Sequence, residues 1–342
     1  MELTEIISLA RELCQAPGIS GREEDAAAAA EKLLAPLGAV ERTPLGSLLC
    51  TVCPGEPGAP HLMLEAHLDQ IGMVVTAVEK GGFLRVANVG GLDRRLLPAS
   101  PVTVHARDGR YAGVVASTPP HLSDGKEKPL KMEGILVDTG LSDEAAREAF
   151  APGDPITLDS DFVEMAGGLI CSGSLDNRAG CAAVIAAARM LRENPGRCRV
   201  TVCLASQEET SGFGAATAAF ALAPDLALIT DVTFGDGFGV KPQECGKVGG
   251  GVEIDYAPAV NRQIFDRLRE LAREKGIPWQ LYAMGSRTGT DTDLIAASGG
   301  GVRCGLLSIP LRNMHTAVET VSARDILHTA SLMAAFAREV QE

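Results

Sequence analysis

The stretch His61-Leu-Met-Leu-Glu-Ala-His67 is an apolar run that stops at a histidine, and it decides the fold that we expect. A short apolar run that follows a turn-rich segment (54–60) predicts a strand that is buried on both faces. Strands of this kind belong to sheets that helices cover on each side. We therefore expect His67 to stand at the carboxyl end of a central strand of an α/β sheet.

Strand-like and helix-like segments alternate over most of the chain on either side of this run. Ser20-Gly-Arg-Glu23 has the pattern of a capping box, which predicts that the Ala-rich segment after it is a helix. Ser322 is the expected cap of the last helix. Alternation of this kind predicts a three-layer α/β domain with a largely parallel sheet. The expected helices are 4–16, 178–193, 215–222, 261–275, 291–298 and 322–340, and the expected strands are 45–53, 61–66, 199–206, 226–230, 279–283 and 302–308.

The pattern changes directly after His67 and changes back near residue 165. Between these points the chain shows short strand-like runs separated by Gly, Pro and Asp turns, and a helical period only at 142–150. This predicts an inserted all-β module of roughly a hundred residues, which is within the usual size of a domain. We therefore expect a discontinuous α/β domain (1–69 and 165–342) that is interrupted by a barrel-like domain (70–164).

Composition limits the partners of the protein. A chain of 342 residues suits two domains, and its net charge of −13 argues against nucleic acid as a partner. The N-terminus lacks an apolar signal core, and no apolar run approaches the ~20 residues that span a bilayer, so a cytoplasmic protein without a membrane partner is expected. The nine cysteines are scattered, and Cys50 and Cys53 fall on opposite faces of an expected strand, which makes them poor metal ligands.

Five segments place His, Asp and Glu close to the points where buried strands end or helices begin. They are residues 65–69, 174–178, 206–209, 229–231 and 312–315. Open α/β sheets bind ligands at the carboxyl ends of their strands, so these segments can converge. Two imidazoles with three carboxylates suit a pair of divalent ions, because the positive charge of the ions would offset the buried carboxylates. Zn²⁺ and Co²⁺ accept nitrogen and oxygen donors together, and Mn²⁺ also suits such ligands. The residues that we expect to meet are His67, Asp69, Asp176, Glu208, Glu209, Asp231 and His315.

The motifs around these residues resemble those of the tetrahedral aminopeptidases, or glutamyl aminopeptidases, a family of co-catalytic dinuclear metallopeptidases. Some members of this family were once described as endoglucanases. The likeness extends over nearly the whole chain, and the motifs agree in order and spacing. The matching motifs are Ala66-His-Leu-Asp-Gln-Ile-Gly72, Leu175-Asp-Asn-Arg-Ala-Gly180, Gln207-Glu-Glu209, Gly289-Thr-Asp291 and Ile309-Pro-Leu-Arg-Asn-Met-His-Thr316.

The resemblance implies an α/β peptidase domain with an inserted barrel-like (PDZ-like) dimerisation domain, and homo-oligomers that range from dimers to tetrahedral dodecamers. The implied activity is removal of N-terminal residues from short peptides by a hydroxide that bridges two divalent ions. Glu208 would be the general base, and Asp69 would orient His67. The implied metal ligands are His67 and Asp231 for one ion, Glu209 and His315 for the other, and Asp176 as the bridge.

The chain departs from the family pattern at positions that are not proposed ligands. Gln70 stands where the family usually has Glu, and Asn313 replaces the usual aromatic residue before His315. The segments 210–213 and 246–251 also differ from the usual motifs. These departures leave open the preferred N-terminal residue of the substrate and the assembly state.

Two other functions are compatible with the same ligands: an amidase or deacylase of small N-acyl substrates, and a metal-stabilised scaffold protein without activity. The presence of Glu208 and of all five ligands argues against the scaffold. A serine hydrolase is excluded because the segment 171–175 is not a G-x-S-x-G elbow, and a glycosidase has no need for the histidines. We expect Arg178 to pair with a nearby carboxylate, and Arg312 to line the pocket or to form a structural ion pair.

Overall fold

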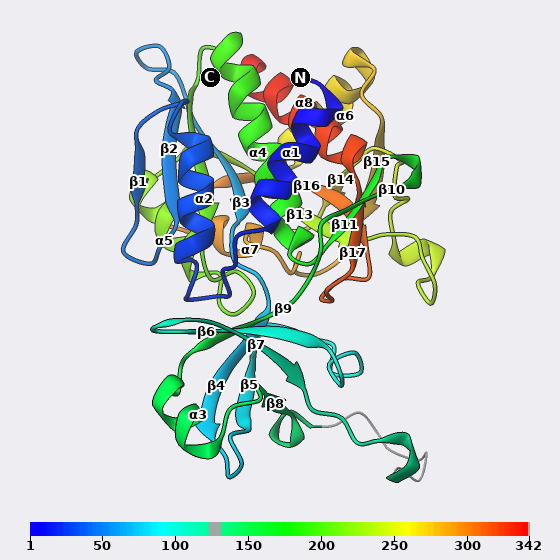
Figure 1. Cartoon of the computed structure of the whole chain (residues 1–342). Helices are drawn as coiled ribbons and strands as arrows, with labels where there is room; N and C mark the ends of the chain where they lie inside the picture. Colours follow the sequence, from blue (N-terminus) through cyan, green and yellow to red (C-terminus); the bar gives the residue numbers. More distant parts are fainter. Residues whose placement is uncertain (123–130, 341–342) are drawn as a thin grey trace.

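The computed structural model describes residues 1–122 and 131–340 and shows a helix-covered sheet above a smaller barrel (Figure 1). Four strands at the centre of the sheet run parallel in the order β12, β3, β13 and β16. Each strand is buried almost throughout because its Leu, Val, Ile and Ala side chains pack on both faces. The bounds of these strands are Arg199–Ala205 (β12), His61–His67 (β3), Leu226–Phe234 (β13) and Arg303–Arg312 (β16).

Antiparallel strands flank this parallel centre, so the expectation of a largely parallel sheet is wrong at its edges. β2 pairs antiparallel with β12, and β16 is followed by antiparallel β17, β11 and β10. β14 pairs antiparallel with β16 and parallel with β15. The flanking strands are Val40–Arg42 (β1), Leu48–Cys53 (β2), Val163–Met165 (β10), Leu169–Ser172 (β11), Val252–Tyr256 (β14), Trp279–Ala283 (β15) and Glu319–Ser322 (β17).

The helices form two groups around the sheet, as a layered α/β fold requires. Helices α1, α4, α6 and α8 are linked by mutual contacts, whereas α5 and α7 pack together over β3, β12 and β16. Within the described residues, no helix is both long and apolar enough to cross a membrane. The helices are Leu3–Cys14 (α1), Glu24–Leu34 (α2), Leu175–Glu193 (α4), Phe213–Leu222 (α5), Arg262–Lys275 (α6), Thr292–Ile295 (α7) and Ala323–Glu339 (α8).

The barrel is inserted between β3 and β10 and closes in the order β4-β5-β8-β7-β6-β9, with all neighbouring strands antiparallel. It has a hydrophobic cluster of its own, which includes Met73, Val104 and Ile156. The predicted fold class, an α/β fold with an inserted all-β barrel, is therefore confirmed. The barrel elements are Gly72–Val78 (β4), Leu84–Val89 (β5), Pro101–Ala106 (β6), Gly109–Val115 (β7), Leu136–Asp138 (β8), Asp143–Ala149 (α3) and Pro155–Leu158 (β9).

One predicted helix cap is wrong and one is confirmed in position. Glu23 occupies the N-cap position of α2 without a capping hydrogen bond, and the Ser20 hydroxyl donates to Asp69 instead. Ser322 is the N-cap residue of α8, as predicted, but its side chain makes no capping hydrogen bond. The Ser20 hydroxyl does not cap the helix because the buried carboxylate of Asp69 needs hydrogen-bond donors.

Candidate metal centre

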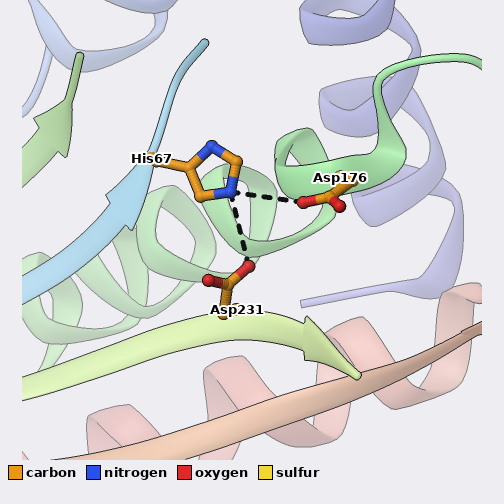
Figure 2. Close-up of side chains that lie close together, drawn as sticks. All are labelled: His67, Asp176 and Asp231. Carbon is orange, nitrogen blue, oxygen red and sulfur yellow. Dashed lines mark ion pairs between the residues drawn. The ribbon is translucent and has the colours of Figure 1, made fainter. Parts of the chain in front are cut away.

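His67 and two carboxylates form a first cluster at the end of the parallel strands (Figure 2). His67 is the last residue of β3, and Asp231 lies on the neighbouring strand β13, so the sheet itself brings them together. The Nε2 atom of His67 is 3.4 Å from Asp231 Oδ1 and 3.2 Å from Asp176 Oδ1, at the start of α4. One potential ligand atom from each of the three residues lies within 4.8 Å of the others.

A second cluster shares Asp176 with the first. The Nε2 atom of His315 is 3.3 Å from Asp176 Oδ2 and 3.5 Å from Glu209 Oε2. Ligand atoms of these three residues also lie within 4.8 Å of one another. Asp176 therefore points one carboxylate oxygen at each histidine. All five residues that the sequence predicts as ligands meet at this place, although whether they bind metal stays a prediction.

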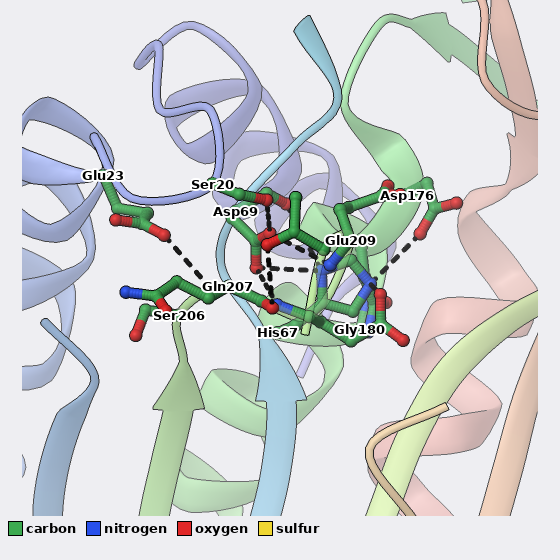
Figure 3. A network of polar contacts seen from close by, with 12 residues as sticks. Ser20, Glu23, His67, Asp69, Asp176, Gly180, Ser206, Gln207 and Glu209 are labelled. Carbon is green, nitrogen blue, oxygen red and sulfur yellow. Dashed lines mark hydrogen bonds and ion pairs between the residues drawn. The ribbon is translucent and has the colours of Figure 1, made fainter. Parts of the chain in front are cut away.

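Asp69 joins the first cluster to the loop that carries the two adjacent glutamates (Figure 3). Its carboxylate lies 3.6 Å from His67 Nδ1 and accepts hydrogen bonds from the backbone N–H groups of Glu208 (2.9 Å) and Glu209 (3.1 Å). The hydroxyl of Ser20 donates to the same carboxylate. Asp69 thus lies beside His67 as expected, and it also holds the backbone of the glutamate loop in place.

The same loop is held a second time by Glu23. The Oε1 atom of Glu23 accepts hydrogen bonds from the N–H groups of Gly21 (2.7 Å) and Gln207 (3.1 Å). Gln207 adopts a positive φ of 65°, a conformation that few non-glycine residues tolerate without support. The hydrogen bonds to Glu23 and Asp69 supply that support on both sides of the turn.

Glu319 is a buried residue of the site that the sequence analysis missed. Its carboxylate accepts from the N–H of His315 (2.8 Å) and from the N–H of Asp176 (3.0 Å), and so ties together the backbones of two predicted ligands. Burial raises the pKa of Glu319 to about 8. A glutamate four residues after His315 in an expected loop gave no signal, because its role depends on the pairing of β17 with β16 and β11.

The electrostatics of the two clusters show a surplus of buried carboxylates. Burial and neighbouring carboxylates raise the pKa of Glu208 to about 8 and that of Glu209 to about 9. Although burial opposes it, the carboxylates of Asp231 and Glu208 raise the pKa of His67 well above its usual value. Such shifts mean that protons relieve the repulsion when no other cation is present. The site therefore favours the binding of positive charge.

The donor set fits divalent metal ions. Each cluster offers one imidazole nitrogen together with carboxylate oxygens, which is the mixture that Zn²⁺ and Co²⁺ accept. Within the described residues, the buried Oε1 atom of Glu209 has no hydrogen-bond partner, so it is available as a ligand. Both clusters line a cavity of about 780 Å³, which gives a substrate access to them.

Two arginines near the predicted motifs have structural roles. Arg178 is fully buried, and its Nη1 atom donates to the backbone oxygen of Leu13 at 3.2 Å. No carboxylate lies within ion-pair distance of Arg178 among the described residues, so the prediction that it pairs with one is wrong. Arg312 forms an ion pair of 2.9 Å with Asp236, which is the structural alternative that we considered.

Imidazoles and carboxylates meet at the carboxyl ends of the parallel strands of this α/β fold, where ligands bind in open sheets, and their donor set suits divalent cations. The model of the M42 glutamyl aminopeptidase family matches residues 46–332. The chain belongs to this family, as its motifs predict, and is therefore a peptidase.

Individual relatives agree with this assignment. A lysyl aminopeptidase of Pyrococcus furiosus is 33% identical over 292 residues, which cover 83% of each chain. The structure of an aminopeptidase from the archaeon Desulfurococcus kamchatkensis superposes with a TM-score of 0.91 at 30% identity, covering 99% of this chain and 96% of the other. The TET1 peptidase of Pyrococcus horikoshii, which can assemble into a tetrahedron or a large octahedral shell, superposes with a TM-score of 0.87 at 27% identity, covering 98% and 99%.

Proposed function

We propose that this protein is an aminopeptidase that removes N-terminal residues from short peptides and depends on two divalent cations, with Zn²⁺ and Co²⁺ preferred and Mn²⁺ also suitable. The observation that carries the proposal is the shared position of Asp176, whose two oxygens face two separate His-carboxylate clusters. The residues that would hold the cations are His67 and Asp231 on one side, Glu209 and His315 on the other, and Asp176 between them.

Bound divalent cations supply positive charge that lowers the pKa of a water molecule and polarises the carbonyl group of a peptide. Residues of the chain hold the proposed ligands and the proposed general base in position. The backbone oxygen of Asp69 contacts His67 Nδ1 at 3.3 Å, and the Asp69 carboxylate accepts from the N–H of Glu208. Glu319 holds the backbones of His315 and Asp176. These contacts would hold the proposed reacting groups in position before a substrate arrives, and such preorganisation favours catalysis.

Glu208 is the proposed general base. Its Oε2 atom lies 3.8 Å from His67 Nε2, so the carboxylate stands beside the first cluster and faces the cavity without belonging to either cluster. Burial raises the pKa of Glu208 in the metal-free chain to about 8, and positive charge bound at the two clusters would lower this pKa toward neutrality, where a carboxylate can accept a proton from water. Glu208 would take a proton from the attacking water and give it to the leaving amine.

We also propose a homo-oligomer, with the barrel of residues 70–164 as the dimerisation domain. The proposal is supported by relatives of similar fold whose structures are assemblies, among them a dodecamer of the Pyrococcus horikoshii TET1 peptidase. Sedimentation of the purified chain tests this: an assembled species is expected, and a monomer at micromolar concentration would contradict it.

The activity is tested by hydrolysis of aminoacyl-p-nitroanilides and unblocked dipeptides after addition of Zn²⁺, Co²⁺ or Mn²⁺. We expect cleavage that a chelator abolishes and that readdition of metal restores. Cleavage of N-acyl amides in place of free dipeptides would favour a metal-dependent deacylase. Peptidase activity that a chelator leaves unchanged would show that the proposed cations are wrong.

A further inference from the structure

We propose that Arg287 binds a carboxylate of the substrate and thereby sets which peptides the enzyme prefers. The inference rests on the proposed function, because it assigns a substrate contact to the same cavity. Arg287 is exposed in the loop between β15 and α7, and it lines the cavity that holds both clusters. Among the described residues that line this cavity, it is the only one with a permanent positive charge.

The position of Arg287 in the chain limits its distance from the reacting centre. Asp291 follows four residues later, is buried, and lies close enough to Glu208 for the two carboxylates to influence each other. Four residues span at most ~14 Å, even when they are fully extended. The backbone of Arg287 therefore lies no more than ~14 Å from that of Asp291, and Arg287, Asp291 and Glu208 line the same cavity.

The loop that carries Arg287 is held in a defined conformation. The carboxylate of Asp293 accepts hydrogen bonds from the N–H groups of Thr288 (3.1 Å) and Gly289 (3.2 Å). The hydroxyls of Thr288, Thr290 and Thr292 form a chain of contacts of 3.0 Å. Because the backbone next to Arg287 is held by these hydrogen bonds, its side chain extends from a defined backbone position, and the loop itself loses less entropy when a ligand binds.

Arg287 has no partner of its own among the described residues, although several carboxylates line the same cavity. Of the acidic residues outside the two clusters, Glu244 is paired with Lys241 at 2.8 Å. Asp293 already accepts the two loop N–H groups. The guanidinium is thus free to bind a planar anion, and carboxylates match its two parallel N–H groups.

A peptide substrate can offer that carboxylate from two places. One is an acidic side chain on the N-terminal residue, and the other is the free C-terminus of a dipeptide or tripeptide. Both present the same chemical group to Arg287, so the geometry favours a substrate carboxylate and the experiment separates the two sources.

The kinetic test compares the metal-loaded wild type with Arg287→Gln and Arg287→Lys on matched substrate pairs. Glutamyl- and glutaminyl-p-nitroanilide differ in the side-chain carboxylate alone, and Leu-Gly and Leu-Gly amide differ in the C-terminal carboxylate alone. We expect Arg287→Gln to lower the charged-to-neutral ratio of kcat/KM by about 10- to 100-fold in one pair. Arg287→Lys should retain an intermediate ratio because it keeps the positive charge but loses the two parallel N–H groups that match a carboxylate.

The matched control is Arg107→Gln, which removes an exposed arginine from the turn between β6 and β7 of the barrel, outside this cavity. It should leave both ratios unchanged. Equal ratios in the wild type and in Arg287→Gln for both substrate pairs would overturn the inference, even if peptide hydrolysis is observed.

A binding measurement separates failure of this inference from failure of the proposed function. Calorimetric titration of the same four compounds into Glu208→Gln, with and without Arg287→Gln, reports affinity in the absence of turnover. We expect the charged member of one pair to bind about 10- to 100-fold more tightly when Arg287 is present. If the wild type cleaves nothing, the proposed activity is wrong, whereas a charged-to-neutral affinity ratio that does not depend on Arg287 disproves its role.

Discussion

The imidazole of His315 lies against the carbonyl oxygen of Gly91, with a distance of 2.9 Å from Nδ1. Gly91 belongs to the loop after β5 of the barrel, and His315 belongs to the α/β part of the chain. If Nδ1 carries the proton and donates to this oxygen, Nε2 is left free to face Asp176 and Glu209. The barrel therefore contributes directly to the orientation of a proposed metal ligand.

Replacement of Gly91 by Ala should weaken metal binding. A Cβ atom at this position would lie 2.7 Å from His315 Nδ1 and 3.0 Å from Cε1, so the ring must move away from its present position. Loss of such an orienting contact typically lowers metal affinity by ~10- to 100-fold. Competition with a fluorescent chelator measures this change.

Gly109→Ala is the matched control for this experiment. Gly109 is the first residue of β7 of the same barrel, and a Cβ atom there would meet nothing within 4 Å. Its metal affinity should equal that of the wild type. Equal affinities for Gly91→Ala and the wild type would show that the contact with Gly91 does not orient His315.

Glu208→Gln should lower kcat by about 10²- to 10⁴-fold while the metal content stays unchanged. The physical reason is that Glu208 faces the cavity outside both clusters, and an amide cannot take a proton from water. Elemental analysis and initial rates on the same preparation measure both quantities. The same change at the adjacent residue, Glu209→Gln, should instead lower the metal content, because Glu209 belongs to the second cluster. A Glu208→Gln protein with normal kcat would rule out the proposed base.

Asp176→Asn should reduce binding of both metal ions, whereas His315→Ala should reduce binding of one. Asp176 offers one oxygen to each cluster, and His315 takes part in the second cluster alone. Metal content per chain after dialysis against a defined free-metal buffer distinguishes the two variants. If both variants lose the same amount of metal, the two clusters do not share Asp176 in the way that the geometry indicates.

The metal-free protein should become less stable as the pH rises from about 6.5 to about 9. Burial raises the pKa of Glu209 from 4.5 to about 9, and hydrogen bonding to Asp176 raises the pKa of His315 from 6.5 to about 9. Because both folded-state values lie above those of the unfolded chain, the folded state binds more protons, and the resulting stabilisation is lost as the pH rises through about 9.

Thermal melts of chelator-treated protein at pH 6.5, 7.5 and 9 measure this loss. Saturating Zn²⁺ should remove or reverse the trend, because metal binds the deprotonated ligands. A melting temperature of the metal-free protein that rises over this pH range would contradict the assignment of the raised pKa values to the site.

The sequence was sufficient for the local features of the fold and of the site. The apolar run before His67, the change of pattern after it and the acidic motifs at strand ends predicted the α/β fold, the inserted barrel and the residues that meet. These features depend on short-range patterns of side chains, which a single sequence displays directly. Family motifs then assigned a role to each residue.

The features that the sequence could not predict depend on long-range pairing. Glu319 reaches His315 and Asp176 because of the strand pairing around β17, and Gly91 reaches His315 because of the way the barrel packs below the sheet. The capping role expected for Ser20 failed for the same reason: a distant carboxylate, Asp69, competes for its hydroxyl. Hydrogen-bond partners that are far apart in sequence leave no periodic signal.

The insertion of the barrel also affects how the chain is made. β3 pairs with β12 and β13, whose residues follow more than a hundred positions later, and His315 is synthesised last of the predicted ligands. During translation, His67 emerges long before Asp176 and Asp231, which lie beside it in the folded chain. The barrel, which lies between His67 and Asp176 in the sequence, can form from local hairpins. The two clusters can therefore be complete only after His315 has left the ribosome.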